Sequence, residues 1–135
     1  MKISRQALES VTKHAQQSKP HECCGILMST SGNDSVVDHI IPAENIEKED
    51  PERGYVLGHK AHLKAVEMEA GGEACIAGYY HSHPNGKARA SKRDVEQAIN
   101  DVIYLITGLG NGEIEHTAWR LVGDDLIPEP LEVSE

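Results

Sequence analysis

The sequence predicts an α/β (α+β) fold in which a mixed central β-sheet is flanked by helices. Stretches with the 3.6-residue period of amphipathic helices alternate with short apolar runs of strand length. Their predicted order is helix, two strands, helix, strand, helix, two strands, which suits one layered core. No linker-like stretch interrupts the 135 residues, and this length is typical of one domain. We therefore expect residues 1–135 to form a single domain.

The first helix is predicted over residues 4–18. Ser4 can act as its N-cap, and Pro20 lies just beyond its end, where proline is common. Its inner face is predicted from apolar residues at near-helical spacing: Leu8, Val11 and Ala15. Residues 24–29 and 36–41 are short apolar runs on either side of a Ser-Gly-Asn-Asp turn. They predict a β-hairpin.

Residues 43–54 are charged and carry a proline and a glycine, so we expect a surface loop there. Residues 55–57 are a candidate strand. The second helix is predicted over residues 59–70 and is ended by a Gly-Gly pair. Three of its residues are predicted to face the core: Leu63, Val66 and Ala70. Residues 75–81 then form a small, apolar run that is typical of a strand buried on both faces.

The third helix is predicted to begin at Ser91 and to run to about Ile99, after a turn at residues 84–86. Two further strands are predicted toward the C-terminus, residues 102–107 and 116–122, and residues 126–133 are a candidate for an additional strand. The last of these is interrupted by Pro128 and Pro130, so we expect it to be short.

The charge balance excludes some classes of partner. The chain has 13 basic and 22 acidic residues, which gives a formal net charge of -9. Such a surface repels phosphate backbones, so we expect no nucleic-acid partner. It suits a substrate with a basic patch, although net charge also serves simply to keep a protein in solution.

Nothing in the sequence predicts a membrane partner, because no apolar run approaches about 20 residues. The first ten residues carry no apolar core of a signal peptide. The cysteines are odd in number, and adjacent cysteines such as Cys23 and Cys24 rarely bond to each other without strain. We therefore expect free thiols in a reducing compartment, the cytoplasm. The oligomeric state stays open.

The segment from His81 to Asp94 carries the strongest chemical signal. Side chains on a strand alternate between faces, so His81 and His83 are predicted to point the same way at the end of a buried strand. Asp94 falls in the first turn of the next helix, from which its carboxylate can return toward the imidazoles. Two nitrogens and one oxygen leave one tetrahedral position open, which is typical of a catalytic zinc site.

Such a site also requires a proton shuttle. A water at the open position has its pKa lowered to about 7. A general base must then take a proton from this water and pass it to the leaving amine. Glu22 is the candidate, because it directly precedes the buried run at 24–29, where partial desolvation raises a carboxyl pKa.

These residues together resemble the JAMM signature of the MPN-plus metalloproteases: Glu22, then His81-x-His83-Pro84, then Ser91-x-x-Asp94. The short chain is similar to the compact bacterial and archaeal members of that family. The resemblance implies an MPN/JAMM-like fold, which is similar to that of cytidine deaminases. It implies that one zinc ion (Zn2+) per chain is bound by His81, His83 and Asp94. It also implies that Glu22 is the general acid/base and that Ser91 stabilises the oxyanion of the tetrahedral intermediate.

Several of these residues also have a purely structural interpretation. Ser91 and Asp94 at a helix start are typical of a capping box, which needs no metal, and both roles stay open for Ser91. Glu22 alone is more typical of a solvated loop residue than of a catalytic group. The cysteines favour apolar packing over metal binding because no Cys-x-x-Cys is present, although the adjacent pair places thiol oxidation near the site. His59 and His62 are expected to be solvated.

The predicted activity is hydrolysis of an amide bond by a metallopeptidase or isopeptidase. Similarity to the compact JAMM proteins implies that the substrate is the Gly-Gly tail of a ubiquitin-like or sulfur-carrier protein. Such a tail suits binding as an added strand at a sheet edge beside the metal. The competing hypothesis is a non-catalytic MPN scaffold that binds partner proteins, although such scaffolds usually lack the metal ligands. A zinc deaminase is disfavoured because its His-x-Glu and Pro-Cys-x-x-Cys signature is missing.

Overall fold

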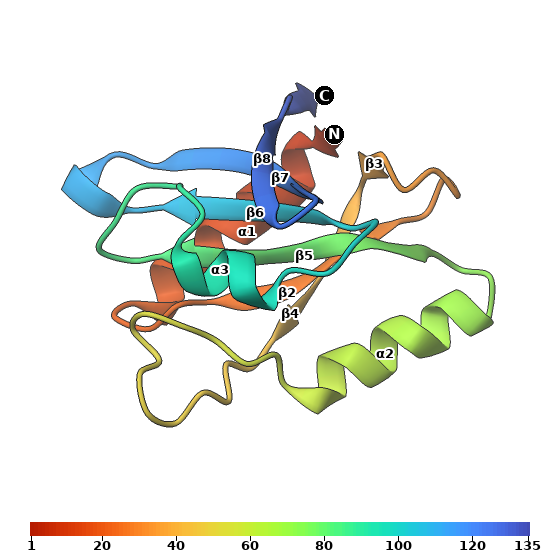
Figure 1. Cartoon of the computed structure of the whole chain (residues 1–135). Coiled ribbons are helices and arrows are strands. Elements are labelled where there is room, and N and C mark those ends of the chain that lie inside the picture. Colours follow the sequence, from red (N-terminus) through yellow and green to blue (C-terminus); the bar gives the residue numbers. More distant parts are fainter.

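The computed structural model describes residues 1–135 and confirms a mixed sheet flanked by helices (Figure 1). The helices are α1 (Arg5–Ser18), α2 (His59–Ala70), α3 (Lys92–Gln97) and a short 3-10 turn, η1 (Gly110–Gly112). The strands are β1 (Lys2–Ser4), β2 (Cys24–Ser29), β3 (Val36–Val37), β4 (His39–Ala43), β5 (Cys75–His83), β6 (Ile103–Gly108), β7 (Glu115–Val122), β8 (Asp125–Glu129) and β9 (Glu132–Ser134).

The main sheet has six strands in the order β4-β2-β5-β6-β7-β8. Within it β5 and β6 pair in parallel, and the other neighbours are antiparallel. β1 lies between β3 and β9 in a small parallel sheet. Strand β5, which carries the two histidines, is therefore an interior strand with its backbone paired on both sides. The free edges of the main sheet are β4 and β8, so β5 itself offers no edge to an added strand.

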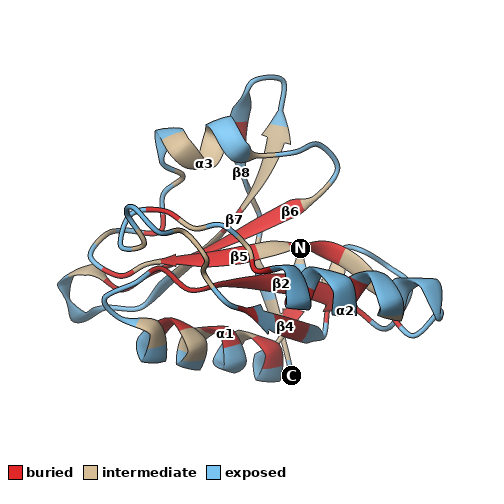
Figure 2. Ribbon diagram, turned by 90° about the horizontal axis from the view of Figure 1, so that it is seen from below, coloured by how far each residue is buried: buried red, intermediate tan, exposed pale blue.

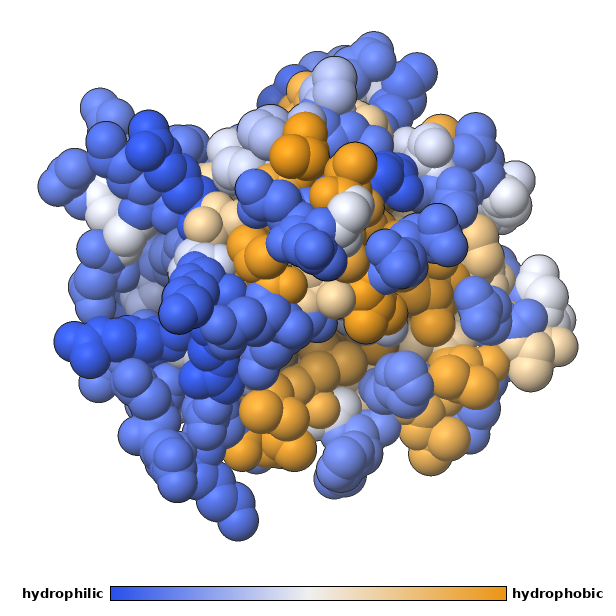
Figure 3. Space-filling model, viewed as in Figure 1, coloured by the Kyte–Doolittle hydropathy of each residue, from blue (hydrophilic) through white to orange (hydrophobic).

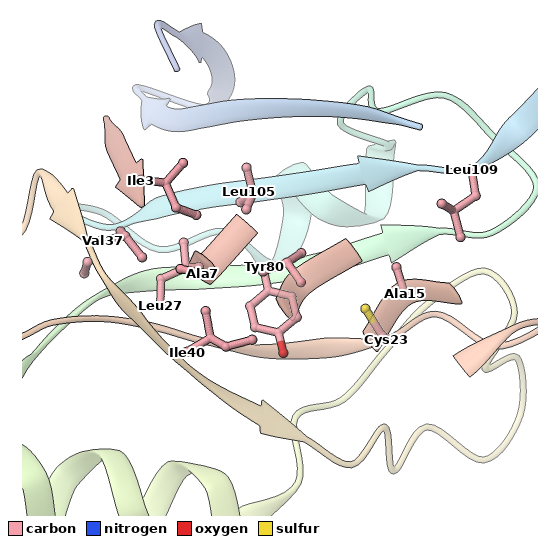
Figure 4. Close-up of a cluster of buried hydrophobic side chains, with 12 residues drawn as sticks. Ile3, Ala7, Ala15, Cys23, Leu27, Val37, Ile40, Tyr80, Leu105 and Leu109 are labelled. Carbon is pink, nitrogen blue, oxygen red and sulfur yellow. The ribbon is translucent and has the colours of Figure 1, made fainter. Parts of the chain in front are cut away.

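The two faces of the main sheet pack against different helices. On β2, Leu27 faces α1, whereas Ile26 and Met28 face α2, as the alternation of a strand requires. Figure 4 shows the core on the α1 side, where Tyr80 of β5 lies with Leu105 of β6. Each such fully buried side chain contributes about 1.5–3 kcal/mol to stability. Figure 2 shows α1 and α3 on opposite sides of this sheet.

The first helix forms close to the predicted bounds. The Ser4 hydroxyl accepts a hydrogen bond from the Ala7 N–H at 3.1 Å, and Val11 and Ala15 are buried. Leu8 is only partly buried. Strand β1 was not predicted, because three residues form a strand only through partners that are distant in the sequence.

The predicted strand over 36–41 is wrong in one respect, because the chain divides there between two sheets. β3 joins the small sheet, whereas β4 pairs with β2 to form the expected hairpin. Asp38 separates the two strands, since its carboxylate accepts a hydrogen bond from the Thr30 N–H at 2.9 Å. Residues 55–57 contribute only an isolated bridge, between Leu57 and Asn45.

The predicted inner face of α2 is wrong. Ala61 and Ala65 are the buried residues, whereas Leu63 and Val66 are 59% and 43% exposed and Ala70 is exposed. Large side chains of the sheet already fill the space beneath α2: Ile26, Met28 and Ile41. Only small residues let the helix approach this surface closely. Apolar side chains therefore remain exposed on the face that carries α2 and α3 (Figure 3).

The C-terminal third differs from the prediction in its boundaries. α3 ends at Gln97, and the last predicted strand is two strands, β8 and β9. Pro128 lies on β8, an edge strand, where a missing N–H does not interrupt the sheet. None of the helices has the length and apolarity that crossing a bilayer requires.

Candidate functional site

The structure brings His81, His83 and Asp94 together at the carboxyl end of β5. The Nε2 atoms of the two histidines lie 3.2 Å apart. The Asp94 carboxylate lies 3.1 Å from Nε2 of His81 and 3.2 Å from Nε2 of His83. Ligand atoms placed 2.0–2.1 Å from a tetrahedral zinc ion are about 3.3 Å apart. The three side chains therefore fit a metal ion, with a fourth position left open.

The hydrogen bonds around His83 prepare it for metal binding. Its Nδ1–H donates to the Lys87 carbonyl at 2.8 Å. This bond leaves the lone pair of Nε2 free to bind a metal. His81 is held differently, because the Tyr55 ring stacks on its imidazole with ring centroids 4.8 Å apart. Sequence reasoning missed Tyr55, since nothing in its neighbourhood links it to a strand more than twenty positions away.

The protonation states of His81 and Asp94 suit a metal centre, whereas a metal ion would displace a proton from His83. Burial lowers the pKa of the His81 imidazole, so the ring stays neutral. Burial also opposes charge on His83, but the hydrogen bonds to Asp94 and to the Lys87 carbonyl outweigh it and raise the pKa. Burial would raise the pKa of Asp94, yet the hydrogen bonds from both histidines outweigh it and hold that pKa well below its usual range. The Asp94 carboxyl group is therefore ionised, as a metal ligand must be.

Glu22 faces the same point from the chain that enters β2. Its carboxylate lies with the ligand nitrogens of His81 and His83, all within 4.8 Å of one another. The side chain is only 4% exposed, and its Oε1 atom has no hydrogen-bond partner. Burial, reinforced by the charge of Asp94, raises the pKa of Glu22 to about 8, although His83 opposes the shift. The interpretation of Glu22 as a solvated loop residue is therefore wrong.

Ser91 forms the capping box that its position predicted. Its hydroxyl oxygen accepts a hydrogen bond from the Asp94 N–H at 3.1 Å, and its own N–H donates to the Asp94 carboxylate at 2.8 Å. Ser91 also lines a cleft of about 490 Å³ whose walls come from residues 50–53 and 83–91 and from Glu22. The structure thus places Ser91 beside the other four candidate residues.

The cysteines and the remaining histidines lie outside this arrangement. Cys23 and Cys24 are buried, and burial raises the pKa of their thiols to about 11 and about 12. Buried thiols that stay protonated are poor metal ligands and react slowly with oxidants. The expectation of thiol oxidation at the site is therefore not supported. His59 and His62 are exposed on α2 and join no cluster of metal-binding side chains.

Comparisons with known proteins identify the family of this chain. The profile of the family described as prokaryotic homologs of the JAB domain matches residues 4–122. A probable TtuB-protein conjugate cleaving protease of Thermus thermophilus is 33% identical over 107 residues, which cover 78% of this chain and 68% of the relative. A desampylase of Haloferax volcanii is 30% identical over 112 residues, which cover 78% of each protein.

Two solved structures show the same fold. Protein DSY2949 from Desulfitobacterium hafniense is 25% identical and has a TM-score of 0.85, with 99% of this chain and 92% of that one covered. AF2198, a JAB1/MPN domain protein from Archaeoglobus fulgidus, is 20% identical and has a TM-score of 0.64, with both chains fully covered. The chain therefore belongs to the JAMM/MPN family, as a compact prokaryotic member of its JAB-domain group.

Proposed function

We propose that the protein is a zinc-dependent isopeptidase or peptidase. Its substrate is an amide bond that follows the Gly-Gly tail of a ubiquitin-like or sulfur-carrier protein. One observation carries the proposal: the buried, unpartnered Glu22 carboxylate faces the point where His81, His83 and Asp94 converge. The names of the two relatives, a protease that cleaves protein conjugates and a desampylase, support the same class of reaction.

The metal would be held by His81, His83 and Asp94. When bound, zinc supplies Lewis-acid chemistry, which acidifies water and polarises a carbonyl oxygen. Glu22 takes a proton from the attacking water and delivers it to the leaving amine. Its raised pKa, about 8, lets the carboxyl group both accept and release a proton near neutral pH. Its free Oε1 atom has no competing partner that would have to be displaced first.

The capping box leaves the hydroxyl proton of Ser91 without an acceptor. The Ser91 oxygen accepts the bond from the Asp94 N–H, so the hydroxyl proton is free to point into the cleft. We assign this proton to the developing oxyanion of the scissile carbonyl, where one preorganised donor contributes about 2.7–4 kcal/mol. Because β5 is interior to the sheet, the substrate tail enters through the cleft between residues 50–53 and 83–91.

The test compares Glu22→Gln with Glu52→Gln. Glu52 lies on the wall of the same cleft but is exposed, so it is a matched control. Glu22→Gln keeps the size and polarity of the side chain, and we expect it to stay folded and to retain its metal and its carrier binding. Its turnover should fall about 10²–10⁴-fold, the usual contribution of a positioned acid/base. Glu52→Gln should keep the kcat of the wild type, because an exposed side chain on the cleft wall transfers no proton, and any contact of Glu52 with the substrate tail changes KM alone.

The measurements are metal content, carrier binding and cleavage of a carrier that bears an amide-linked lysine at its Gly-Gly tail. Undiminished cleavage by Glu22→Gln would remove this residue from the mechanism. If the wild type binds zinc and carrier but cleaves no such tail, the protein is instead a scaffold.

A further inference from the structure

Helix α3 carries Asp94 but has no buried residue of its own. A helix of six residues is also too short to be stable alone. Polar contacts at its ends therefore contribute much of what holds it in place, since Val95 is only half-buried. The capping box at Ser91 organises the first turn from within, and the Tyr104 hydroxyl accepts a hydrogen bond from the Ile99 N–H just after the last turn, at 2.8 Å. Neither contact ties α3 to the segment that carries Glu22.

Arg93 makes that connection. It directly precedes Asp94, and its guanidinium forms an ion pair with Glu47, in the loop between β4 and α2. The guanidinium also packs against Gly54, where an added Cβ would overlap it. The side chains of Arg93 and Glu47 are 33% and 16% exposed, so the pair is partly shielded from solvent.

The loop that contains Glu47 also forms hydrogen bonds with the backbone of Glu22. We call this loop, residues 44–58, the bracing loop. The Asn45 side-chain amide donates to the Glu22 carbonyl at 3.0 Å, and its oxygen accepts from the Glu47 N–H at 3.0 Å. The Glu22 N–H donates to the Pro51 carbonyl at 2.8 Å. Tyr55, which stacks on His81, belongs to this loop as well.

We propose that Arg93 and Glu47 are positioning residues, whose ion pair fixes α3 on the bracing loop and so sets Asp94 relative to Glu22 and His81. A series of contacts links the Glu22 backbone to Asp94: Asn45 bonds the Glu22 carbonyl and the Glu47 N–H, and Glu47 pairs with Arg93, the residue before Asp94. The effect on metal binding rests on the proposed function. The effect on the placement of α3 does not, because it follows from contacts within the chain.

The test is a double-mutant cycle with Glu47→Gln, Arg93→Gln and the double variant. Zinc affinity is measured by competition with a chelator, and kcat and KM are measured on the carrier substrate. Each single variant should bind zinc about 10–100-fold more weakly, as expected for a residue that orients a ligand. The double variant should lose no more than either single variant, because the two side chains act as one unit. The loss in activity should appear in kcat and not in KM.

Arg120→Gln is the matched control. Arg120 and Glu129 form an ion pair of similar exposure between β7 and β8, away from the site, with N and O 3.0 Å apart. This variant should keep the zinc affinity of the wild type. Equal zinc binding by Glu47→Gln and the wild type, or additive losses in the double variant, would overturn the proposal.

Failure of the proposed function gives a different result. If the wild type binds no zinc, the proposed metal centre is wrong, and the positioning role is then decided by hydrogen exchange of the metal-free protein. Faster exchange of the α3 amides in Glu47→Gln than in Arg120→Gln supports the positioning role, and equal exchange overturns it.

Discussion

The two halves of the candidate metal centre are built in different ways. His81 and His83 stand on β5, an interior strand that pairs with β2 and β6 along the site, and His81 is 1% exposed. Asp94 stands on α3, which buries none of its residues. The strand half is fixed by the same packing that folds the protein. The helix half depends on a capping box, the Arg93–Glu47 ion pair and the ligand contacts themselves.

This difference implies that metal binding affects the local order of α3 but not that of β5. Electrostatic and hydrogen-bond contacts on a partly exposed helix stabilise it by about 1 kcal/mol each. Core packing around an interior strand contributes several times more. Loss of the metal should therefore loosen α3 while β5 keeps its structure, and the largest predicted effects test that division.

The first prediction is that His83→Ala abolishes the metal centre. Zinc content should fall from about one ion per chain to nearly none, because only two protein ligands remain. Cleavage should fall about 10³-fold or more, since several kcal/mol of Lewis-acid stabilisation are lost. Hydrogen exchange should become faster in α3 and stay slow in β5 and β6. Metal analysis, turnover and mass-spectrometric exchange measure the three effects.

His59→Ala is the control for that variant. His59 is exposed at the start of α2 and touches no part of the site, so zinc content and turnover should be unchanged. Full zinc occupancy in His83→Ala would contradict the assignment of the ligands. Equal loosening of β5 and α3 would contradict the division between the two halves.

The second prediction uses the same substitution in each half. A Cβ at Gly78 of β5 would overlap the Ile103 backbone of β6, so Gly78→Ala must push two paired strands apart. We expect it to lower the free energy of unfolding by about 3 kcal/mol, the upper range for overpacking. A Cβ at Gly86, in the segment between β5 and α3, would meet only the His83 Cβ at 3.7 Å, an ordinary contact.

Gly86→Ala should therefore change the free energy of unfolding by less than about 1 kcal/mol. Urea unfolding of both variants measures the difference. Equal destabilisation would show that the segment before α3 is packed as tightly as the strand, and the comparison between the halves would fail.

The same division explains how much of the site the sequence predicts. His81 and His83 follow from strand alternation, and the spacing of Ser91 and Asp94 follows from helix capping, so both halves are visible as local patterns. The contacts of the bracing loop, in contrast, cannot be predicted from the sequence. Asn45, Tyr55 and Glu47 act through partners far along the chain, and a charged loop with a proline gives no sign of them.

The fold is predictable to a similar depth. The helices and the interior strands follow from periodicity, whereas β1 depends on partners at the other end of the chain. The buried face of α2 shows why apolar residues alone mislead. The larger Leu63 and Val66 point outward, because the sheet beneath the helix leaves room only for Ala61 and Ala65.

The third prediction separates the two roles of Ser91, where the expected change in stability is smallest. Ser91→Ala removes the cap and the hydroxyl, so it should cost about 1 kcal/mol of stability and lower turnover about 10²-fold. Glycine is also tolerated at an N-cap, and Ser91→Gly should cost only a few tenths of a kcal/mol. Both variants lack the hydroxyl proton, and their turnover should therefore fall equally although their stabilities differ. Ser91→Thr keeps both the cap and the donor and should behave like the wild type. If Ser91→Gly instead recovers most of the activity, Ser91 serves only to order the first turn of α3. The oxyanion donor must then be sought elsewhere in the cleft.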